Sequence, residues 1–258
     1  MSGFDALVLA GARPGPDPVA QYAGVPHKAL ITLAGETLIA RVLKALAAAG
    51  ARRIAVSTSD PAVLAALETL DVANEVEVRA LPAAPSLSQS VREGLAQMGA
   101  PLLVTTVDHA LLQPEWVVRF LADAPADADI SVLLAPKAAV VAAAPESVRT
   151  YLKFRDGLYS GCNLFYLRTD RALAAVDLWR RVEAYRKQPW KIAALLGPMT
   201  LVRYGLGLLT LDEAVAGLGA KVGIAAAAVR SPYGLCAVDV DKPADLDLVR
   251  RLVEGPGT

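Results

Sequence analysis

Short apolar segments alternate with helical segments through the first half of the chain, and this alternation constrains the fold more than any other feature. Each apolar segment has the length of a strand and ends near a turn residue such as Gly11 or Asp108. The predicted strands cover residues 4–10, 53–57, 75–80, 101–107 and 130–135, and the helices between them cover 37–49, 61–70, 88–98 and 115–122. This order predicts an α/β fold, with a mostly parallel sheet and helices on both faces. Such sheets bind ligands beyond the carboxyl ends of their strands.

The second half of the chain is less regular. Two strands are expected around a turn at Asp156-Gly157, and a mostly helical stretch is expected to break near Gly197-Pro198. The predicted strands are 151–154, 163–167, 222–229 and 235–240, and the predicted helices are 170–185, 192–211, 211–217 and 243–253. No repeat or Gly- and Ser-rich linker divides the sequence. We therefore expect one domain over residues 1–258, with a helical insert at about 170–217.

Charge and cysteine content exclude several classes of protein. Twenty-six Lys and Arg balance twenty-six Asp and Glu, so a general nucleic-acid binder with a basic face is not expected. An apolar fraction of 54% argues against disorder. Two cysteines, Cys162 and Cys236, cannot build a disulfide framework, and no basic segment precedes the first apolar run. These features predict a cytoplasmic protein.

The loop after the first strand has the features of a phosphate-binding loop. It reads Leu9-Ala10-Gly11-Ala12-Arg13-Pro14-Gly15, and Pro26-His27-Lys28-Ala29-Leu30 follows downstream. Small residues let backbone N–H groups face an anion, and the cations of Arg13 and Lys28 suit a triphosphate. A Gly- and Pro-rich surface loop with two solvated basic residues is the alternative. The combination of both segments with Leu33-x-Gly35 favours the functional interpretation.

Acidic residues follow two other predicted strands. Asp108 ends the strand 101–107, and Asp239 and Asp241 lie on one face of the strand 235–240 if that strand continues through them. We expect Asp108 and Asp241 to share a Mg²⁺ ion, with Asp239 as the substitute ligand. A structural turn or helix cap is the alternative role for Asp108. Asp245 falls in a first helical turn, where a carboxylate stabilises the helix.

These three segments resemble the molybdenum-cofactor guanylyltransferase-like (MobA-like) nucleotidyltransferases. The resemblance covers residues 6–46, 88–114 and 235–249, in the order that the family shows. It implies a GT-A-like, Rossmann-like fold and an NTP bound over residues 10–15, with catalytic roles for Arg13, Lys28 and Asp108 and with Mg²⁺ on Asp108 and Asp241. The nucleotide-binding residues that it implies are Leu9, Ala10, Gly11, Ala12, Arg13, Gly15, Lys28 and Ser90, the last near the base.

The sequence also departs from the family pattern. The family loop usually reads Leu-Ala-Ala-Gly-x-Gly-x-Arg-Met-Gly, whereas this loop is shortened before Arg13 and lengthened by residues 16–24. Leu87 stands where related methylerythritol enzymes carry an Arg ahead of the Ser-Val pair. For this reason the base and the acceptor cannot be transferred from the family, although CTP or GTP is expected as the nucleotide. Ser90 has the alternative role of an ordinary helix residue.

Two later segments bear on the acceptor. Gly161-Cys162-Asn163 resembles a Gly-x-Asn segment with which related enzymes hold the acceptor, and Lys153 is placed to meet its phosphate; an exposed β-hairpin is the alternative. Residues 178–211 join five basic side chains and three aromatic ones to an apolar stretch, as in a membrane-surface helix: Arg180, Arg181, Arg186, Lys187, Lys191, Trp179, Tyr185 and Trp190. A pair of helices with a solvated basic face is favoured over a peripheral membrane contact. Arg203 argues against a transmembrane span.

The sequence therefore predicts a Mg²⁺-dependent nucleotidyltransferase that moves an NMP group from an NTP to a phosphorylated, sugar- or lipid-related acceptor and releases pyrophosphate. A GT-A glycosyltransferase that uses Asp239-Val240-Asp241 is one alternative. A non-catalytic nucleotide-binding or membrane-associated module is the other. His109 could line the site, but a phosphate acceptor needs no base, since it is already ionised at neutral pH.

Overall fold

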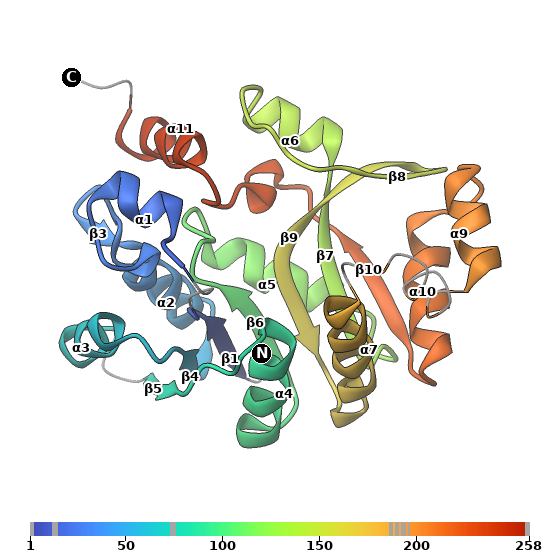
Figure 1. The fold of residues 1–258 in the computed structure, drawn as a ribbon, viewed down its shortest axis with the longest axis horizontal. Helices are drawn as coiled ribbons and strands as arrows, with labels where there is room; N and C mark the ends of the chain where they lie inside the picture. Colours follow the sequence, from blue (N-terminus) through green and yellow to red (C-terminus); the bar gives the residue numbers. More distant parts are fainter. Residues whose placement is uncertain are drawn as a thin grey trace.

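A mixed, mostly parallel sheet of eight strands forms the centre of the molecule (Figure 1). The computed structural model describes residues 3–11, 15–72, 76–185, 188, 191, 195 and 197–255. The strands lie in the order β10-β7-β9-β6-β1-β4-β5, and β8 pairs with β9 outside this path. Their bounds are β1 Phe4–Leu9, β4 Ala51–Ser57, β5 Glu77–Leu81, β6 Leu102–Thr106, β7 Ile130–Pro136, β8 Leu152–Phe154, β9 Gly157–Leu167 and β10 Ala226–Arg230.

Strand β9 is the exception in this parallel sheet. It runs antiparallel to both β6 and β7, and it lies between them. In the register, Phe165 lies opposite Val104 of β6, and Leu167 lies opposite both Leu102 and Ile130. Since β9 runs in reverse, its first half reaches the edge where the parallel strands β1, β6 and β7 end. The side chains of β9 therefore join the ligand-binding edge of the sheet.

Helices cover both faces of the sheet, as the alternating pattern predicts. One face packs on α2 (Leu38–Ala48), α5 (Pro114–Asp123), α6 (Lys137–Ala143) and α11 (Pro243–Glu254), which enclose the larger apolar core. The other face packs on α4 (Leu87–Met98), α7 (Leu173–Ala184) and α10 (Leu211–Lys221), and Figure 1 shows α4 and α7 in front of the sheet. The α/β fold with a mostly parallel sheet is confirmed.

Helix starts follow the local signals in the sequence. Asp60 caps α3 (Pro61–Thr69) because its Oδ1 accepts hydrogen bonds from Ala62 N and Val63 N, at 2.9 and 3.1 Å. Asp17 caps the short α1 (Pro18–Ala23) in the same way. Helix α9 (Pro198–Gly205) begins after Gly197, whose φ is +87°, so the predicted break at Gly197-Pro198 is confirmed.

Several predicted boundaries are wrong, and one strand is absent. Residues 235–240 do not form a strand; the chain makes the 3₁₀ turn η3 (Gly234–Ala237) and then an extended loop. A Cβ at Gly234 would collide with the carbonyl of Ala139 in α6, so η3 packs against the α6 backbone through this glycine. Strand β10 begins at Ala226 rather than at residue 222. Helices α1 and α6 were not predicted, nor was the hairpin of β2 (Thr32–Leu33) with β3 (Glu36–Thr37).

The basic and apolar segment 178–211 is described only in part. Arg186, Lys187, Trp190, residues 192–194 and residue 196 lie outside the described residues, so the expectations for them stay untested. On α9, the side chains of Met199 and Val202 are exposed, and Leu206 just after the helix is exposed as well. Among the described helices, none combines the length and the apolar character needed to cross a bilayer.

Candidate functional site

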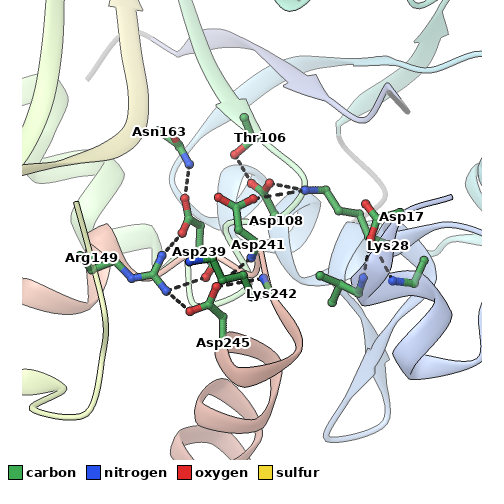
Figure 2. A network of polar contacts seen from close by, with 12 residues as sticks. Asp17, Lys28, Thr106, Asp108, Arg149, Asn163, Asp239, Asp241, Lys242 and Asp245 are labelled. Atoms are coloured by element: carbon green, nitrogen blue, oxygen red, sulfur yellow. Dashed lines mark hydrogen bonds and ion pairs between the residues drawn. The ribbon is translucent and has the colours of Figure 1, made fainter. Parts of the chain in front are cut away.

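Four segments that are distant in sequence meet at one edge of the sheet (Figure 2). They are the turn that carries Lys28, the end of β6 with Asp108, the middle of β9 with Asn163, and the loop from Asp239 to Asp245. The 3₁₀ turn η1 (Lys28–Leu30) presents Lys28, and His27 caps it because Nδ1 of His27 accepts a hydrogen bond from Ala29 N at 3.0 Å. His27 is buried. It thus has a structural role beneath Lys28.

Lys28 lies between the two acids that were predicted to meet. Its Nζ is 2.5 Å from Oδ2 of Asp108 and 3.8 Å from Oδ1 of Asp241. Thr106 donates a hydrogen bond to the other oxygen of Asp108. The Asp108 side chain is 11% exposed, whereas that of Asp241 is 60% exposed. The site therefore has a buried carboxylate on one side, an open carboxylate on the other, and an ammonium group in contact with both.

Electrostatics keep Lys28 charged. Burial lowers the pKa of this amine and is the largest single effect, but the adjacent carboxylate of Asp108 and then that of Asp241 raise the pKa above its ordinary value overall. Lys28 is therefore a cation across the physiological pH range. A fixed positive charge at the sheet edge suits the phosphates of a nucleotide.

Asp239, the substitute metal ligand, is engaged elsewhere. One of its oxygens pairs with Arg149, and the other accepts a hydrogen bond from Nδ2 of Asn163 at 2.8 Å. Burial, followed by the charge of Asp241, raises the pKa of Asp239 to about 6, although Arg149 opposes this shift. The glycosyltransferase alternative needs Asp239 and Asp241 as a ligand pair. The contacts of Asp239 do not favour that pairing.

Arg149 organises the loop that carries Asp241, and the sequence analysis did not identify it. Its side chain is only 8% exposed, and it pairs with Asp239 and, at 2.5 Å, with Oδ1 of Asp245. The second oxygen of Asp245 accepts hydrogen bonds from Asp241 N at 3.2 Å and Lys242 N at 3.0 Å. Figure 2 shows these contacts as one continuous network. Asp245 therefore has the structural role at the start of α11 that the sequence indicated.

The phosphate-loop residues are placed at the end of β1. Leu9 and Ala10 are buried, and Ala10 N donates to Ser57 O at 2.9 Å, so this N–H belongs to the sheet. Gly11 lies against Ala83, since a Cβ at Gly11 would be 3.4 Å from that methyl group. Gly15 is exposed and has a φ of +100°, while Ala12 and Arg13 lie outside the described residues. The Ala10 N–H is therefore not available to donate to an anion.

Ser90 lies beside the same loop. Its Oγ accepts a hydrogen bond from Ala84 N at 3.0 Å, and it is buried near the start of α4. This bond fixes the segment around Ala83 that contacts Gly11. Ser90 therefore supports the wall of the loop, and its role toward a base stays a prediction.

The three predicted acceptor residues do not gather at one point. Gly161 is exposed and has open space where a side chain would be, close to Asn163 on β9. Asn163 adopts a φ of +50° and points its amide at Asp239. Lys153 pairs with Leu158, five residues before Asn163, which places it roughly 16 Å away along the strand. Lys153 is thus remote from the acids.

His109 does not line the surface of the site. It is 1% exposed, its Nδ1 is 3.4 Å from the Thr105 hydroxyl, and its ring lies 6.2 Å from that of Trp116. Burial lowers the pKa of His109 to about 4, so the imidazole is neutral at physiological pH. It belongs to the core beneath Asp108.

The acids at this edge fit a Mg²⁺ ion that is completed by its substrate. Among the described residues no group of three or more His, Cys, Asp or Glu side chains could hold a metal ion by itself. Mg²⁺ uses one or two carboxylates together with water and phosphate oxygens. Asp108 and Asp241 face one shared cation, the Lys28 ammonium, and so offer such a pair.

Solved structures of other proteins share this fold. A transferase structure from Thermus thermophilus, described as hypothetical, is 33% identical with a TM-score of 0.80, and the match covers 95% of this chain and 99% of that one. CMP:2-keto-3-deoxy-manno-octonic acid synthetase, solved with CTP, shares the fold at 19% identity and a TM-score of 0.55, over 97% of this chain and 98% of that one.

A nucleotidyl transferase from Methanothermobacter thermautotroptrophicus also shares the fold, at 19% identity and a TM-score of 0.56, over 98% of this chain and 99% of that one. No curated protein matches the sequence. The family model of the MobA-like NTP transferase domain matches residues 6–159, which include Lys28 and Asp108. The chain belongs to the MobA-like NTP transferase domain family and is a nucleotidyltransferase.

Proposed function

We propose that this nucleotidyltransferase moves an NMP group from an NTP to a phosphorylated small-molecule acceptor with the help of Mg²⁺. The observation that carries the proposal is the Lys28 ammonium held between Asp108 and Asp241 at the carboxyl edge of the sheet. Ligands of parallel sheets bind at this edge. CTP and GTP are the nucleotides that we expect, and the synthetase of the same fold that was solved with CTP supports a pyrimidine nucleotide.

In this proposal Asp108 and Asp241 hold the ion, which neutralises phosphate charge and orients the triphosphate. Lys28 and Arg13 bind the phosphates, and the backbone from Gly11 to Gly15 cradles them. An oxygen of the acceptor phosphate attacks the α-phosphorus, the bond from that phosphorus to the bridging oxygen breaks, and pyrophosphate leaves. Because the acceptor is already ionised, no base is required. Catalysis then consists of positioning and charge stabilisation.

Exchange of Asp108 for Asn tests this proposal, because it removes one negative charge and keeps the shape of the side chain. With the wild-type protein, a thermal-shift screen of NTPs with Mg²⁺ finds the nucleotide, since a ligand that binds the folded state raises its melting temperature. Pyrophosphate release is then measured over phosphorylated acceptors. We expect Asp108→Asn to lower kcat by about a hundredfold or more, the size seen when one preorganised electrostatic group is removed.

Asp123→Asn serves as the matched control, since Asp123 pairs with Arg119 within α5, on the surface and away from the site. It should leave the rate unchanged. Circular dichroism melts of both variants show whether they fold. Full activity of a folded Asp108→Asn protein at saturating Mg²⁺ and NTP contradicts the proposal.

Location and membrane contact stay predictions from the sequence. A cytoplasmic location is expected. Among the described residues of 178–211, the exposed side chains of Met199, Val202, Leu206 and Leu208 support a peripheral membrane contact. Co-sedimentation with vesicles of anionic phospholipid tests the contact. Equal recovery of the protein in the supernatant with and without vesicles rejects it.

A further inference from the structure

An apolar pocket of about 390 Å³ lies between α7, α10 and the sheet, apart from the acids. Its walls come from all three layers: Val132 and Phe165 from the sheet, Trp179 and Val182 from α7, and Val215 and Leu218 from α10. The ring centroids of Phe165 and Trp179 lie 6.2 Å apart with 22° between the ring planes, so two stacked aromatic side chains form part of the lining. The volume falls within the range of about 300–1,000 Å³ that is usual for small-molecule sites.

The pocket is continuous with the strands that carry the candidate site. Val104 of β6 and Phe165 of β9 lie opposite each other and both line the pocket. Two residues further toward the site edge, β6 reaches Thr106, which donates to Asp108, and β9 reaches Asn163, which donates to Asp239. Two residues of strand span about 7 Å. Val104, which lines the pocket, therefore lies about 7 Å along β6 from Thr106.

From there the pocket extends away from the acids. Ile130 and Leu167, which lie opposite each other at the far end of β7 and β9, also line it. To reach this pocket, a ligand whose polar end lies at Asp108 and Asp241 would direct its other end along the sheet, between α7 and α10. Val91, the neighbour of Ser90 on α4, also lines the pocket.

The chemistry of the walls selects the ligand. Every described residue of the lining is apolar or glycine, so a sugar hydroxyl placed against these side chains would lose its hydrogen bonds to water without replacement. An alkyl or isoprenoid chain gains free energy by leaving water. We propose that this pocket binds the apolar chain of the acceptor, so that the acceptor is an amphiphilic phosphate monoester. This inference rests on the proposed function for its polar end.

Binding of a homologous series to the full-length protein tests the pocket. Butyl, hexyl and octyl phosphate share one head group, and isothermal titration calorimetry gives their dissociation constants. Full burial of one methylene tightens binding about fourfold, so octyl phosphate should bind at least about tenfold tighter than butyl phosphate. The series is measured on the unmodified protein and is decisive even if a variant fails to fold.

Two variants on α10 locate the effect. Val215→Trp fills the pocket and should weaken octyl phosphate at least about fivefold while leaving butyl phosphate unchanged. Ala216→Trp adds the same indole to the exposed side of the helix and should change neither constant. Equal affinity along the series overturns the inference, as does an equal effect of both variants.

Failure of the proposed function is distinguishable from failure of the pocket. If affinity rises with chain length but no alkyl phosphate supports pyrophosphate release with any NTP, the proposed reaction is wrong and the assignment of this pocket to an acceptor falls with it. If pyrophosphate is released at a KM that does not depend on chain length, the reaction holds and the pocket assignment is wrong. A KM that falls with chain length and rises in Val215→Trp supports both.

Discussion

At the scale of single residues, Arg149 connects two acids that the sequence places in different roles. It reaches Asp239 and Asp245 at once from the chain between α6 and β8, and through Asp245 it fixes the backbone of Asp241. A guanidinium presents several donors in a fixed plane and suits such a bridge. Because these groups are largely buried, each charge depends on its partner for stabilisation.

Replacement of Arg149 by Met should lower the free energy of unfolding by about 3–5 kcal/mol, since it leaves Asp239 and Asp245 without their counter-charge. Urea denaturation followed by circular dichroism measures the loss. Arg119→Met, which removes an exposed arginine from a surface pair with Asp123, is the control and should change the midpoint little. A second exchange, Asp239→Asn in the Arg149→Met protein, should restore part of the stability. Equal losses in the two single variants would contradict this role of Arg149.

The sequence identified part of this network. Asp108 and Asp241 were predicted to meet around a cation, and the structure places both beside Lys28, which was predicted to bind phosphates. Each follows a recognisable local signal, either the end of an apolar strand or a short family motif. Arg149 carries no such signal, because it lies in no motif and its partners are some 90 residues away in sequence. The choice between Asp239 and Asp241 also depends on tertiary contacts, since Arg149 and Asn163 hold Asp239.

At the scale of elements, helix propensity disfavours glycine, but the close approach of a helix to a strand explains the glycine at position 94. In α4, a Cβ at Gly94 would lie 2.5 Å from Cδ2 of Leu7, so α4 packs directly on β1 through this residue. In α10, Gly217 has no atom within 4 Å of the place of a Cβ. The two helices therefore carry glycine under different constraints.

Alanine at these two positions should change stability in opposite directions. Ala is better than Gly in a helix by about 1 kcal/mol, so Gly217→Ala should raise the free energy of unfolding by up to that amount. Gly94→Ala gains the same helix propensity, but its methyl group crowds Leu7. Because overpacking costs about 1–3 kcal/mol, we expect a net decrease in the free energy of unfolding. Chemical denaturation of the two variants beside the wild type measures both. A stabilised Gly94→Ala protein would show that α4 can move off β1.

Most elements of the first half were predictable, because strand and helix periodicities alternate there and caps such as Asp60 mark the helix starts. The errors gather where tertiary packing decides. The stretch 235–240 has the composition of a strand, but η3 packs on α6 at Gly234 and no strand partner receives it. The position of β9 between two parallel strands also had no local signal. Which strands pair with each other depends on the tertiary structure and cannot be predicted from the apolar pattern of each strand.

At the scale of the whole molecule, the reaction rate of the two cysteine thiols measures how often the protein unfolds. Cys162 of β9 and Cys236 of η3 are each 1% exposed, and both are free thiols in the larger core. Burial, and then the neighbouring Cys236, raise the pKa of the Cys162 thiol well above its ordinary value. The thiolate is the reactive form, so the burial of both thiols and the raised pKa of Cys162 disfavour reaction in the folded protein.

We expect both thiols to react with a disulfide reagent only when the molecule unfolds. For a protein stable by at least about 5 kcal/mol, labelling through unfolding should be at least about four-thousandfold slower than for free cysteine. Absorbance of the released thiolate, measured across a urea series, gives the rates. Two thiols should react at once in denaturing urea. Rapid labelling of either thiol in buffer alone would mean that β9 or η3 opens locally.

The network at the sheet edge also has a consequence for synthesis of the chain. Lys28 and Asp108 belong to the first half, whereas Asp241 and its anchor Asp245 follow the last strand described here. A ribosome that has made β1 to β9 has already produced most of the sheet, yet the acid opposite Lys28 is still missing. The nascent protein can therefore fold much of its core before the site is complete. Only the emergence and docking of α11 bring the final carboxylate into place.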